Sequence, residues 1–166
     1  MPEILSFGKY SGLSVEQVLL QDYNYFVQVL ETTAMPDALK ARFNFVEFVA
    51  NNFVSQQSCA DTGCMEPAKH LVVYRYNSRG RSPLEGAIYC SEGCFQLAGT
   101  HSTYELTLEP LRFRTALSPR HHDASDFVEL FSECMGIKEG RKTKKYLEEV
   151  FDNCKTWKKY TPTKNR

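Results

Sequence analysis

The sequence predicts an α+β protein made of small units, and three patterns support this fold class. Along about the first fifty residues, apolar side chains recur every three or four positions, as they do in amphipathic helices. Two cysteine pairs then enclose a stretch rich in β-branched and aromatic residues, which is typical of strands. A second set of helical stripes follows. We therefore expect a helical module at residues 1–56, a cysteine-bearing segment with β-hairpins at 57–118, and a pair of helices with a basic tail at 119–166.

Composition and charge limit the classes of protein to which the chain can belong. Of its 166 residues, 42% are hydrophobic and 13% aromatic, so the chain is long enough to bury a core. It has no apolar run of the roughly 18 to 20 residues that a membrane span requires and no export signal, so we expect an intracellular, cytoplasmic protein. The net charge is zero, but residues 138–166 carry ten basic and four acidic side chains, and this local charge of +6 favours a polyanionic partner.

Three helices are predicted in the N-terminal module. Ser14 and Gln17 have the spacing of a capping box, so we expect the first helix to begin at Ser14 and to end near Asp22. A second apolar stripe begins at Tyr23 and ends between residues 31 and 34. The third helix is expected over about residues 36–53, with Pro36 in its first turn, where a missing N–H leaves no hydrogen bond unmade.

A glycine-containing run near the N-terminus carries a further pattern. Its residues are Phe7, Gly8, Lys9, Tyr10, Gly12, Val18, Asp22, Tyr25 and Phe26. Over about residues 5–53 it resembles the FGKYKG…V…D..YL.W pattern of the small accessory domain of exodeoxyribonuclease X-like proteins, although Gln28 stands where that family commonly has tryptophan. The resemblance implies a non-catalytic role beside nucleic-acid enzymes, with Lys9 and Tyr10 against a phosphate and a base. Alternatively, Gly8 and Gly12 only shape a turn and Tyr10 packs into the core.

The cysteines have the spacing of metal ligands. Cys59 and Cys64 form a C-x4-C pair and Cys90 and Cys94 a C-x3-C pair, so each pair can supply two thiolates to a tetrahedral Zn²⁺ ion. Such a site has no open coordination position, so its zinc would be structural. A free-thiol or redox role is the alternative, and His70 or His101 remains a possible replacement for one cysteine. Two further cysteines, Cys134 and Cys154, lie outside the pairs.

The elements around these cysteines follow a recognisable order. Gly63 suits a tight knuckle between the first two cysteines, residues 70–76 and 86–89 read as two strands, and a helix is expected from the second pair to about Gly99. Knuckle, hairpin and helix is the order of a treble-clef zinc finger. The run IYCSEGC resembles the end of treble clefs of the TRASH and FCS-type families, over about residues 57–99. A helix N-terminus at the second pair favours the thiolate form of the ligands.

The remainder of the chain is expected to contain a second hairpin, or an extension of the first hairpin's sheet, and two helices. Residues 104–108 and 111–117 alternate between apolar and polar side chains, as strands do, with Arg112 and Arg114 on one face. His121, His122 and Asp123 are expected in a linker, because no nucleophile or carboxylate pair is spaced to join them. Apolar stripes predict one helix that ends at Gly136 and another at about 142–157, and we expect these helices to pair as an antiparallel hairpin.

Basic and aromatic side chains suggest the function. Arginine and lysine bind phosphates, and tyrosine and tryptophan stack on bases, so we expect a non-catalytic protein that binds DNA or RNA. The candidate contact residues are Lys9, Tyr10, Arg75, Arg79, Arg81, Arg112, Arg114, Lys142, Lys144, Lys145, Trp157 and Lys158. The alternative function is a protein-interaction adaptor that docks a nucleic-acid-processing enzyme. A nuclease is disfavoured, because no acidic residues are spaced to hold catalytic Mg²⁺.

Overall fold

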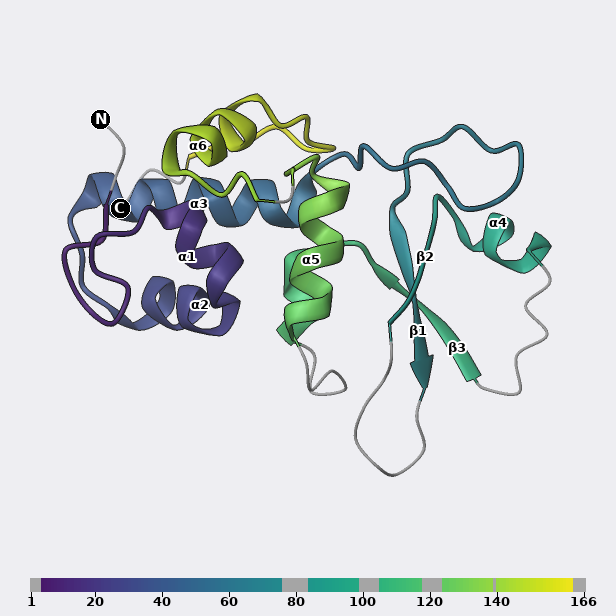
Figure 1. Cartoon of the computed structure of the whole chain (residues 1–166), viewed down its shortest axis with the longest axis horizontal. Helices are drawn as coiled ribbons and strands as arrows, with labels where there is room; N and C mark the ends of the chain where they lie inside the picture. Colours follow the sequence, from purple (N-terminus) through teal and green to yellow (C-terminus); the bar gives the residue numbers. More distant parts are fainter. Residues whose placement is uncertain (1–3, 76–83, 99–104, 118–123, 139, 163–166) are drawn as a thin grey trace. The chain divides into compact units, whose positions relative to one another are not determined.

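A computed structural model describes residues 4–75, 84–98, 105–117, 124–138 and 140–162 (Figure 1). The chain divides into two compact units, which we call the helical unit (Met1–Phe53 with Ile137–Arg166) and the sheet unit (Val54–Gly136). Within the described ranges, helices accompany one small antiparallel sheet, so the predicted α+β class is confirmed. No helix among these residues is long and apolar enough to cross a bilayer.

The helical unit begins with three short connected helices, α1 (Val15–Gln21), α2 (Tyr23–Thr32) and α3 (Asp37–Asn52). The predicted capping box is confirmed, because the Gln17 N–H donates to Ser14 Oγ at 3.4 Å and the Ser14 N–H donates to Gln17 Oε1 at 3.0 Å. Asp22 ends α1 and caps α2 by accepting the Tyr25 N–H at 2.9 Å. Local side-chain chemistry therefore sets the boundaries of the first two helices.

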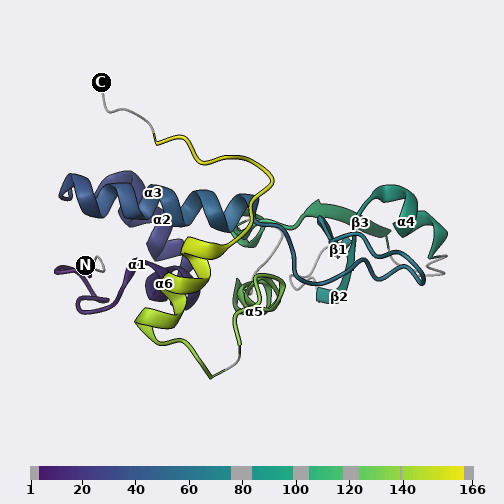
Figure 2. The ribbon, with the colours of Figure 1, turned by 90° about the horizontal axis from the view of Figure 1, so that it is seen from above.

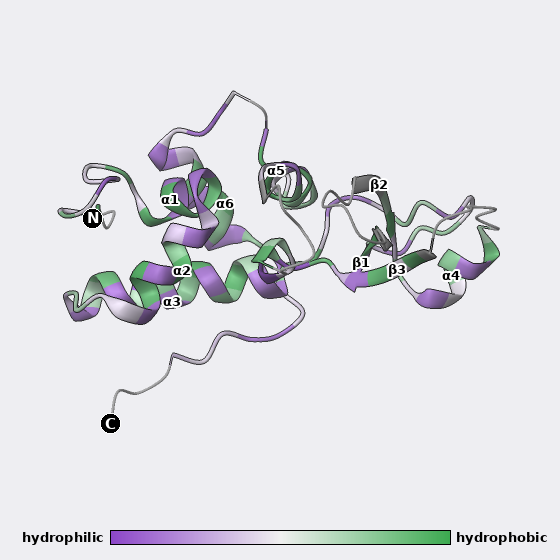
Figure 3. Cartoon of the chain, turned by 90° about the horizontal axis from the view of Figure 1, so that it is seen from below, coloured by the Kyte–Doolittle hydropathy of each residue, from purple (hydrophilic) through white to green (hydrophobic). Residues whose placement is uncertain are grey.

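The core of the helical unit also includes α6 (Lys144–Asn153), which lies against α1 (Figure 2). Figure 3 shows the hydrophobic stripes of these helices in green. The buried apolar side chains include Val15, Val18, Leu19, Phe26, Phe43, Val46, Leu147 and Phe151. Arg42, on α3, links this helix to α1 and to α6. Its Nε donates to Glu16 Oε1 on α1, and its Nη1 donates to Asp152 Oδ1 on α6, both at 2.6 Å.

The C-terminal helix is shorter than predicted. It ends at Asn153 instead of Trp157, and the chain that follows runs along α3. Thr156 forms an isolated β-bridge with Phe53, and the Trp157 N–H donates to the Asn52 carbonyl at 2.8 Å. The backbone groups that would have continued the helix are used in these contacts with the end of α3.

The sheet unit contains three antiparallel strands in the order β2-β1-β3. These strands are β1 (His70–Arg75), β2 (Leu84–Tyr89) and β3 (Glu105–Pro110). A short helix, α4 (Glu92–Leu97), follows β2. Helix α5 (Ala124–Cys134) packs against β2 and against the 3-10 helix η1 (Phe113–Leu117), with the rings of Phe113 and Phe131 stacked 4.9 Å apart. These elements give the unit an apolar core at one end and place the cysteine pairs at the other.

The predicted second hairpin is wrong in its second half. Residues 105–110 form the expected strand, but residues 113–117 form η1. Phe113 and Ala116 are both buried, a spacing of three that fits a 3-10 turn and not a strand. The Thr115 hydroxyl also donates to the Pro110 carbonyl at 2.6 Å, which favours the turn over an extended backbone.

The two C-terminal helices belong to different units. Helix α5 packs within the sheet unit, whereas α6 packs against α1 in the helical unit. The apolar stripes predicted that both helices exist, but the two do not pair as the expected hairpin, since a stripe shows only that a face is buried and not which element covers it.

Candidate metal centre

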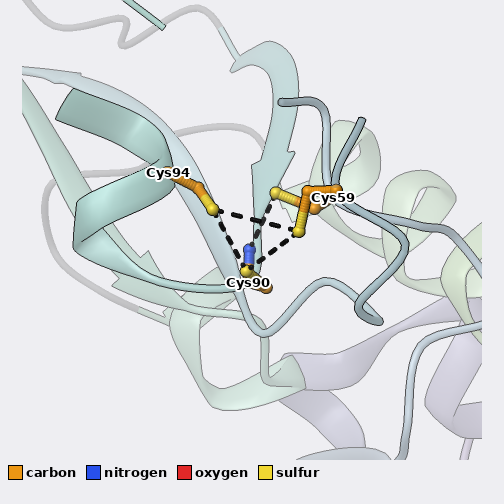
Figure 4. Close-up of side chains that lie close together, drawn as sticks. Cys59, Cys90 and Cys94 are labelled. Atoms are coloured by element: carbon orange, nitrogen blue, oxygen red, sulfur yellow. Dashed lines mark hydrogen bonds between the residues drawn. The ribbon is translucent and has the colours of Figure 1, made fainter. Parts of the chain in front are cut away.

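Four cysteine sulfurs come together at one end of the sheet unit. Cys59 and Cys64 precede β1, Cys90 directly follows β2, and Cys94 lies in α4. All four sulfur atoms lie within 4.8 Å of one another. Figure 4 shows Cys94 and Cys90 directed toward the same point as Cys59. All six cysteines of the chain are free of disulfide bonds, so this is a cluster of four separate thiol groups.

Three of the distances between the sulfurs, those among Cys64, Cys90 and Cys94, are close to the distances around a tetrahedral metal ion. They are 3.6 Å from Cys64 to Cys90, 3.5 Å from Cys90 to Cys94 and 3.9 Å from Cys94 to Cys64. Four sulfurs at about 2.3 Å from a central ion lie about 3.8 Å apart when the geometry is tetrahedral. A disulfide would need a sulfur–sulfur distance of about 2.05 Å. The four residues therefore form a cluster that could hold a metal ion.

The first cysteine pair is positioned by a tight turn and by hydrogen bonds to the sheet. Gly63 has a φ of 92°, a left-handed conformation that favours glycine, and it directly precedes Cys64. The Cys59 N–H donates to the Glu66 carbonyl at 2.9 Å, which closes the turn. The Ala60 N–H donates to the Ile88 carbonyl at 2.8 Å and so fixes this turn beside β2. The predicted knuckle at Gly63 is confirmed.

The second pair is positioned by the start of α4. Ser91 caps this helix, and its Oγ accepts the Cys94 N–H at 3.3 Å. The Cys90 N–H points at Cys59 and donates to its sulfur at 3.4 Å (Figure 4). An N–H directed at a sulfur stabilises the thiolate that binds a metal ion. This hydrogen bond thus links one cysteine of each pair through the backbone.

Negative charge is shared unequally among the thiols. Hydrogen bonding with the side chains of Cys94 and Ser91, which lie 3.5 and 3.8 Å from the Cys90 sulfur, lowers the pKa of Cys90 despite its partial desolvation. Donation to Cys90 raises the pKa of Cys94 to about 12. Although a backbone hydrogen bond with Glu66 lowers it, desolvation and hydrogen bonds with Cys90 and Cys59 raise the pKa of Cys64 overall. Closely spaced thiolates repel one another, and a cation at the centre of the cluster would remove this repulsion, so metal binding would be coupled to proton release.

Few apolar side chains support this end of the sheet. Its buried cluster consists of Cys59, Val72 and Tyr89, with partly buried neighbours around it. The Tyr89 and Phe95 rings meet edge to face with their centroids 5.6 Å apart. No residue of α4 is buried, although this helix carries a ligand cysteine. Hydrophobic burial alone therefore gives α4 little stability against the sheet.

Of the other candidate ligands, those that the structure describes lie outside the cluster. His70 is the first residue of β1 and pairs with Tyr89 and Pro110 across the sheet, and it is not among the clustered groups. His101 lies outside the described residues. Burial raises the pKa of both Cys134 and Cys154 to about 11, so these two side chains stay as neutral thiols at neutral pH. The two predicted cysteine pairs therefore form the cluster, and Cys134 and Cys154 lie outside it.

Lys9 and Tyr10, two of the predicted nucleic-acid contacts, bind Asp22 of their own chain. Lys9 Nζ lies 2.7 Å from Asp22 Oδ2, and the Tyr10 hydroxyl donates to the same oxygen at 3.1 Å. The ammonium group also lies over the rings of Tyr10 and Tyr25, 4.8 and 5.3 Å from their centroids. A Cβ on Gly8 would overlap the Tyr25 hydroxyl, so this turn requires glycine. These contacts support the alternative interpretation, in which the run shapes a turn.

The remaining predicted contacts are divided between the two units. In the helical unit, Lys142, Lys145, Trp157 and Lys158 are exposed and Lys144 is half-buried. Arg112 and Arg114 are exposed in the sheet unit, and Arg75 is the last residue of β1. Two predicted contacts, Arg79 and Arg81, lie outside the described residues.

Tyr160 has a structural role that the sequence did not indicate. Its ring meets Phe45 at 5.3 Å and Phe48 at 5.2 Å between centroids, so it is held against α3. The predicted C-terminal helix ends at about residue 157, before Tyr160. The sequence contains one signal for this contact, the pair of aromatic residues three positions apart on α3, but it does not show which residue packs against that pair.

Comparisons with protein-family models, curated proteins and solved structures find no match for this chain.

Proposed function

We propose that Cys59, Cys64, Cys90 and Cys94 bind one structural Zn²⁺ ion in a treble-clef arrangement. The distances of 3.5 to 3.9 Å among the sulfurs of Cys64, Cys90 and Cys94 and the position of all four sulfurs within 4.8 Å of one another support this assignment, together with the order of turn, strand pair and short helix. Thiolate ligands in tetrahedral geometry favour Zn²⁺ over Mg²⁺ or Ca²⁺, which prefer oxygen. With four protein ligands the ion has no position for water or substrate, so its role is to hold the fold.

We further propose that the protein binds nucleic acid without catalysis, through the basic residues of its C-terminal segment. The observation that carries this proposal is the exposure of Lys142, Lys145, Lys155, Lys158 and Lys159 in a segment of net charge +6. Among the described residues, the ion pairs of the helical unit are made by Lys9 and Arg42, and none is made by these lysines. Each lysine that neutralises a phosphate adds to a salt-dependent affinity.

Two measurements test this function. Elemental analysis of purified protein is expected to give about one zinc per chain. Fluorescence anisotropy with labelled DNA and RNA is expected to show binding that weakens steeply between 50 and 200 mM salt, by about ten-fold or more if two or three phosphates are neutralised. Protein that binds neither polymer at low salt would exclude the nucleic-acid role while leaving the zinc site unaffected.

A second candidate function is an adaptor that docks a protein partner, and one observation favours it. Met65 and Leu97 are 85% and 79% exposed, and they lie one and three residues from the ligands Cys64 and Cys94. Large exposed apolar side chains beside a rigid site are typical of docking surfaces. A photo-crosslinker at Leu97 would identify such a partner. Binding to that partner would respond little to salt, unlike binding to nucleic acid.

A further inference from the structure

The segment at residues 155–160, which we call the basic segment, has a defined conformation outside any helix or strand. Its N-terminal half is fixed to the end of α3 by the Thr156–Phe53 bridge and by the Trp157 N–H, which donates to the Asn52 carbonyl at 2.8 Å. The Thr156 hydroxyl donates to the Lys158 carbonyl at 2.5 Å, which closes a local turn. Tyr160 fixes the other end against Phe45 and Phe48.

Between these fixed ends the segment presents cations and one large ring to solvent. Lys155, Lys158 and Lys159 are exposed, and Trp157 is 47% exposed. Asp152, the nearest preceding acid, is held by Arg42 through Oδ1. The lysines therefore act together as a local positive charge around an indole ring whose backbone is already ordered by the fold.

We propose that the basic segment binds single-stranded nucleic acid, with a base stacked on Trp157 and phosphates neutralised by the adjacent lysines. This inference rests on the nucleic-acid function proposed above and names the form of the ligand. In a single strand the faces of the bases are accessible, and stacking on an aromatic ring favours binding for any base. In a duplex the bases are stacked on one another, so only the lysines contribute.

Preorganisation is the second reason for assigning the role to this segment. A flexible basic tail loses conformational freedom when it binds, which weakens its affinity. Here the bridge to Phe53 and the packing of Tyr160 have already ordered the backbone on both sides of Trp157. The backbone that carries Trp157 therefore loses little further conformational entropy when a base binds to the ring.

Because Trp157 is the only tryptophan of the chain, its intrinsic fluorescence reports directly on the proposed contact. We expect saturable quenching when the full-length protein is titrated with oligo(dT) or oligo(rU) of about 12 nucleotides, a length within the usual range for single-strand sites. A hairpin duplex with the same number of phosphates is expected to quench weakly and to bind less tightly. The DNA and RNA arms distinguish the two possible sources of the single strand.

Variants separate stacking from charge. Trp157→Ala is expected to weaken binding to oligo(dT), measured by anisotropy of the labelled oligonucleotide, by about ten-fold, whereas Trp157→Phe keeps a ring and loses less. Lys158→Ala is expected to reduce the slope of log affinity against log salt by about one. Lys40→Ala, an exposed residue near the start of α3, is the matched charge control and should leave the affinity nearly unchanged. Circular dichroism spectra establish that each variant is folded.

The outcomes distinguish this inference from the function on which it rests. Equal affinity for duplex and single strand, without quenching, would overturn the stacking role and leave the nucleic-acid function standing. No binding to any polymer would overturn both. A tryptophan on a positively charged surface can also bind an anionic membrane, so the same fluorescence titration is carried out with vesicles containing phosphatidylserine. A blue shift of Trp157 fluorescence with vesicles but no response to oligonucleotides would overturn the inference in favour of a lipid surface.

Discussion

The helical unit and the cysteine end of the sheet unit are held together by different kinds of interaction. In the helical unit, aliphatic and aromatic side chains from α1, α3 and α6 are buried in one core that includes Phe43 and Phe151. At the cysteine end, the buried cluster among the described residues consists of Cys59, Val72 and Tyr89, and α4 has no buried residue. The cysteine end contains four sulfur atoms in place of a packed apolar core.

This difference teaches that one chain can stabilise its parts in two ways. Burial of apolar surface contributes about 25 cal/mol for each Å² removed from water, and the helical unit has many such contacts. A small cluster with an exposed helix gains little from burial, so the proposed zinc ion would supply stability that packing does not. The units should therefore respond independently to loss of metal and to loss of packing.

The largest expected effect is on the cysteine end. Cys94→Ser removes one ligand, so the zinc and the ordered structure around α4 should both be lost, since zinc binding in finger peptides contributes on the order of 10 kcal/mol. Zinc content would be measured together with the amide NMR spectrum. Signals from the helical unit should persist, and the fluorescence of Trp157, which lies in that unit, should change little.

The control for this variant is Cys154→Ser. Cys154 is a cysteine outside the cluster and should leave the zinc content unchanged. Metal-free Cys94→Ser protein with an intact spectrum of the sheet unit would contradict the proposed dependence on zinc.

A second substitution, Arg42→Met, is expected to lower the stability of the helical unit alone. Glu16 is 1% exposed, and Arg42 supplies its positive partner, so Arg42→Met leaves a buried carboxylate without compensation. Breaking a buried pair from one side costs about 3 to 5 kcal/mol. Urea unfolding followed by Trp157 fluorescence should show this loss of stability, while the zinc content of the protein should not change.

A double variant separates the pair from the packing around it. Glu16→Met combined with Arg42→Met removes both charges, and we expect it to regain most of the lost stability because apolar side chains can replace a buried pair. Asp152→Asn removes only the exposed partner of Arg42 and should cost less than about 1 kcal/mol. A double variant no more stable than Arg42→Met would show that the pair itself is not the source of the loss.

Local chemistry made much of the fold predictable from the sequence. Ser14 and Gln17 define a helix start because the two side chains satisfy backbone groups within four residues. The spacing of Cys59, Cys64, Cys90 and Cys94 identified the cluster for a similar reason, since each pair needs only a short turn to bring two thiols together. Features that depend on neighbours in sequence were therefore predicted correctly.

Features that depend on distant partners were not predictable in the same way. The pairing of Lys9 with Asp22 joins residues 13 apart, and nothing in a single sequence distinguishes it from a free lysine. Helices α5 and α6 have similar apolar stripes, yet they pack in different units. The 3-10 helix at 113–117 depends on burial of Phe113 and Ala116, which only the folded chain reveals.

The smallest expected effect is the pH dependence that Asp22 gives to the stability of the helical unit. Although burial alone would raise its pKa, hydrogen bonds from Lys9, the Tyr25 N–H and Tyr10 lower the pKa of Asp22 below its ordinary value of 3.8. A carboxylate whose pKa is depressed by folding stabilises the protein above its unfolded pKa, and this contribution is lost as the pH falls through the folded pKa. The stability of the helical unit should therefore decrease below about pH 4 in part through Asp22.

Two substitutions divide the roles of Asp22. Asp22→Asn can still cap α2 but carries no charge, so the difference in stability between it and the wild-type protein should shrink as the pH falls from 5 to below 3. Asp22→Ala also loses the cap and should cost about 1 kcal/mol more than Asp22→Asn at neutral pH. Both are measured by urea unfolding with Trp157 fluorescence, which reports on the helical unit. A difference between wild type and Asp22→Asn that stays constant with pH would mean that the Lys9–Asp22 contact does not stabilise this unit through its charge.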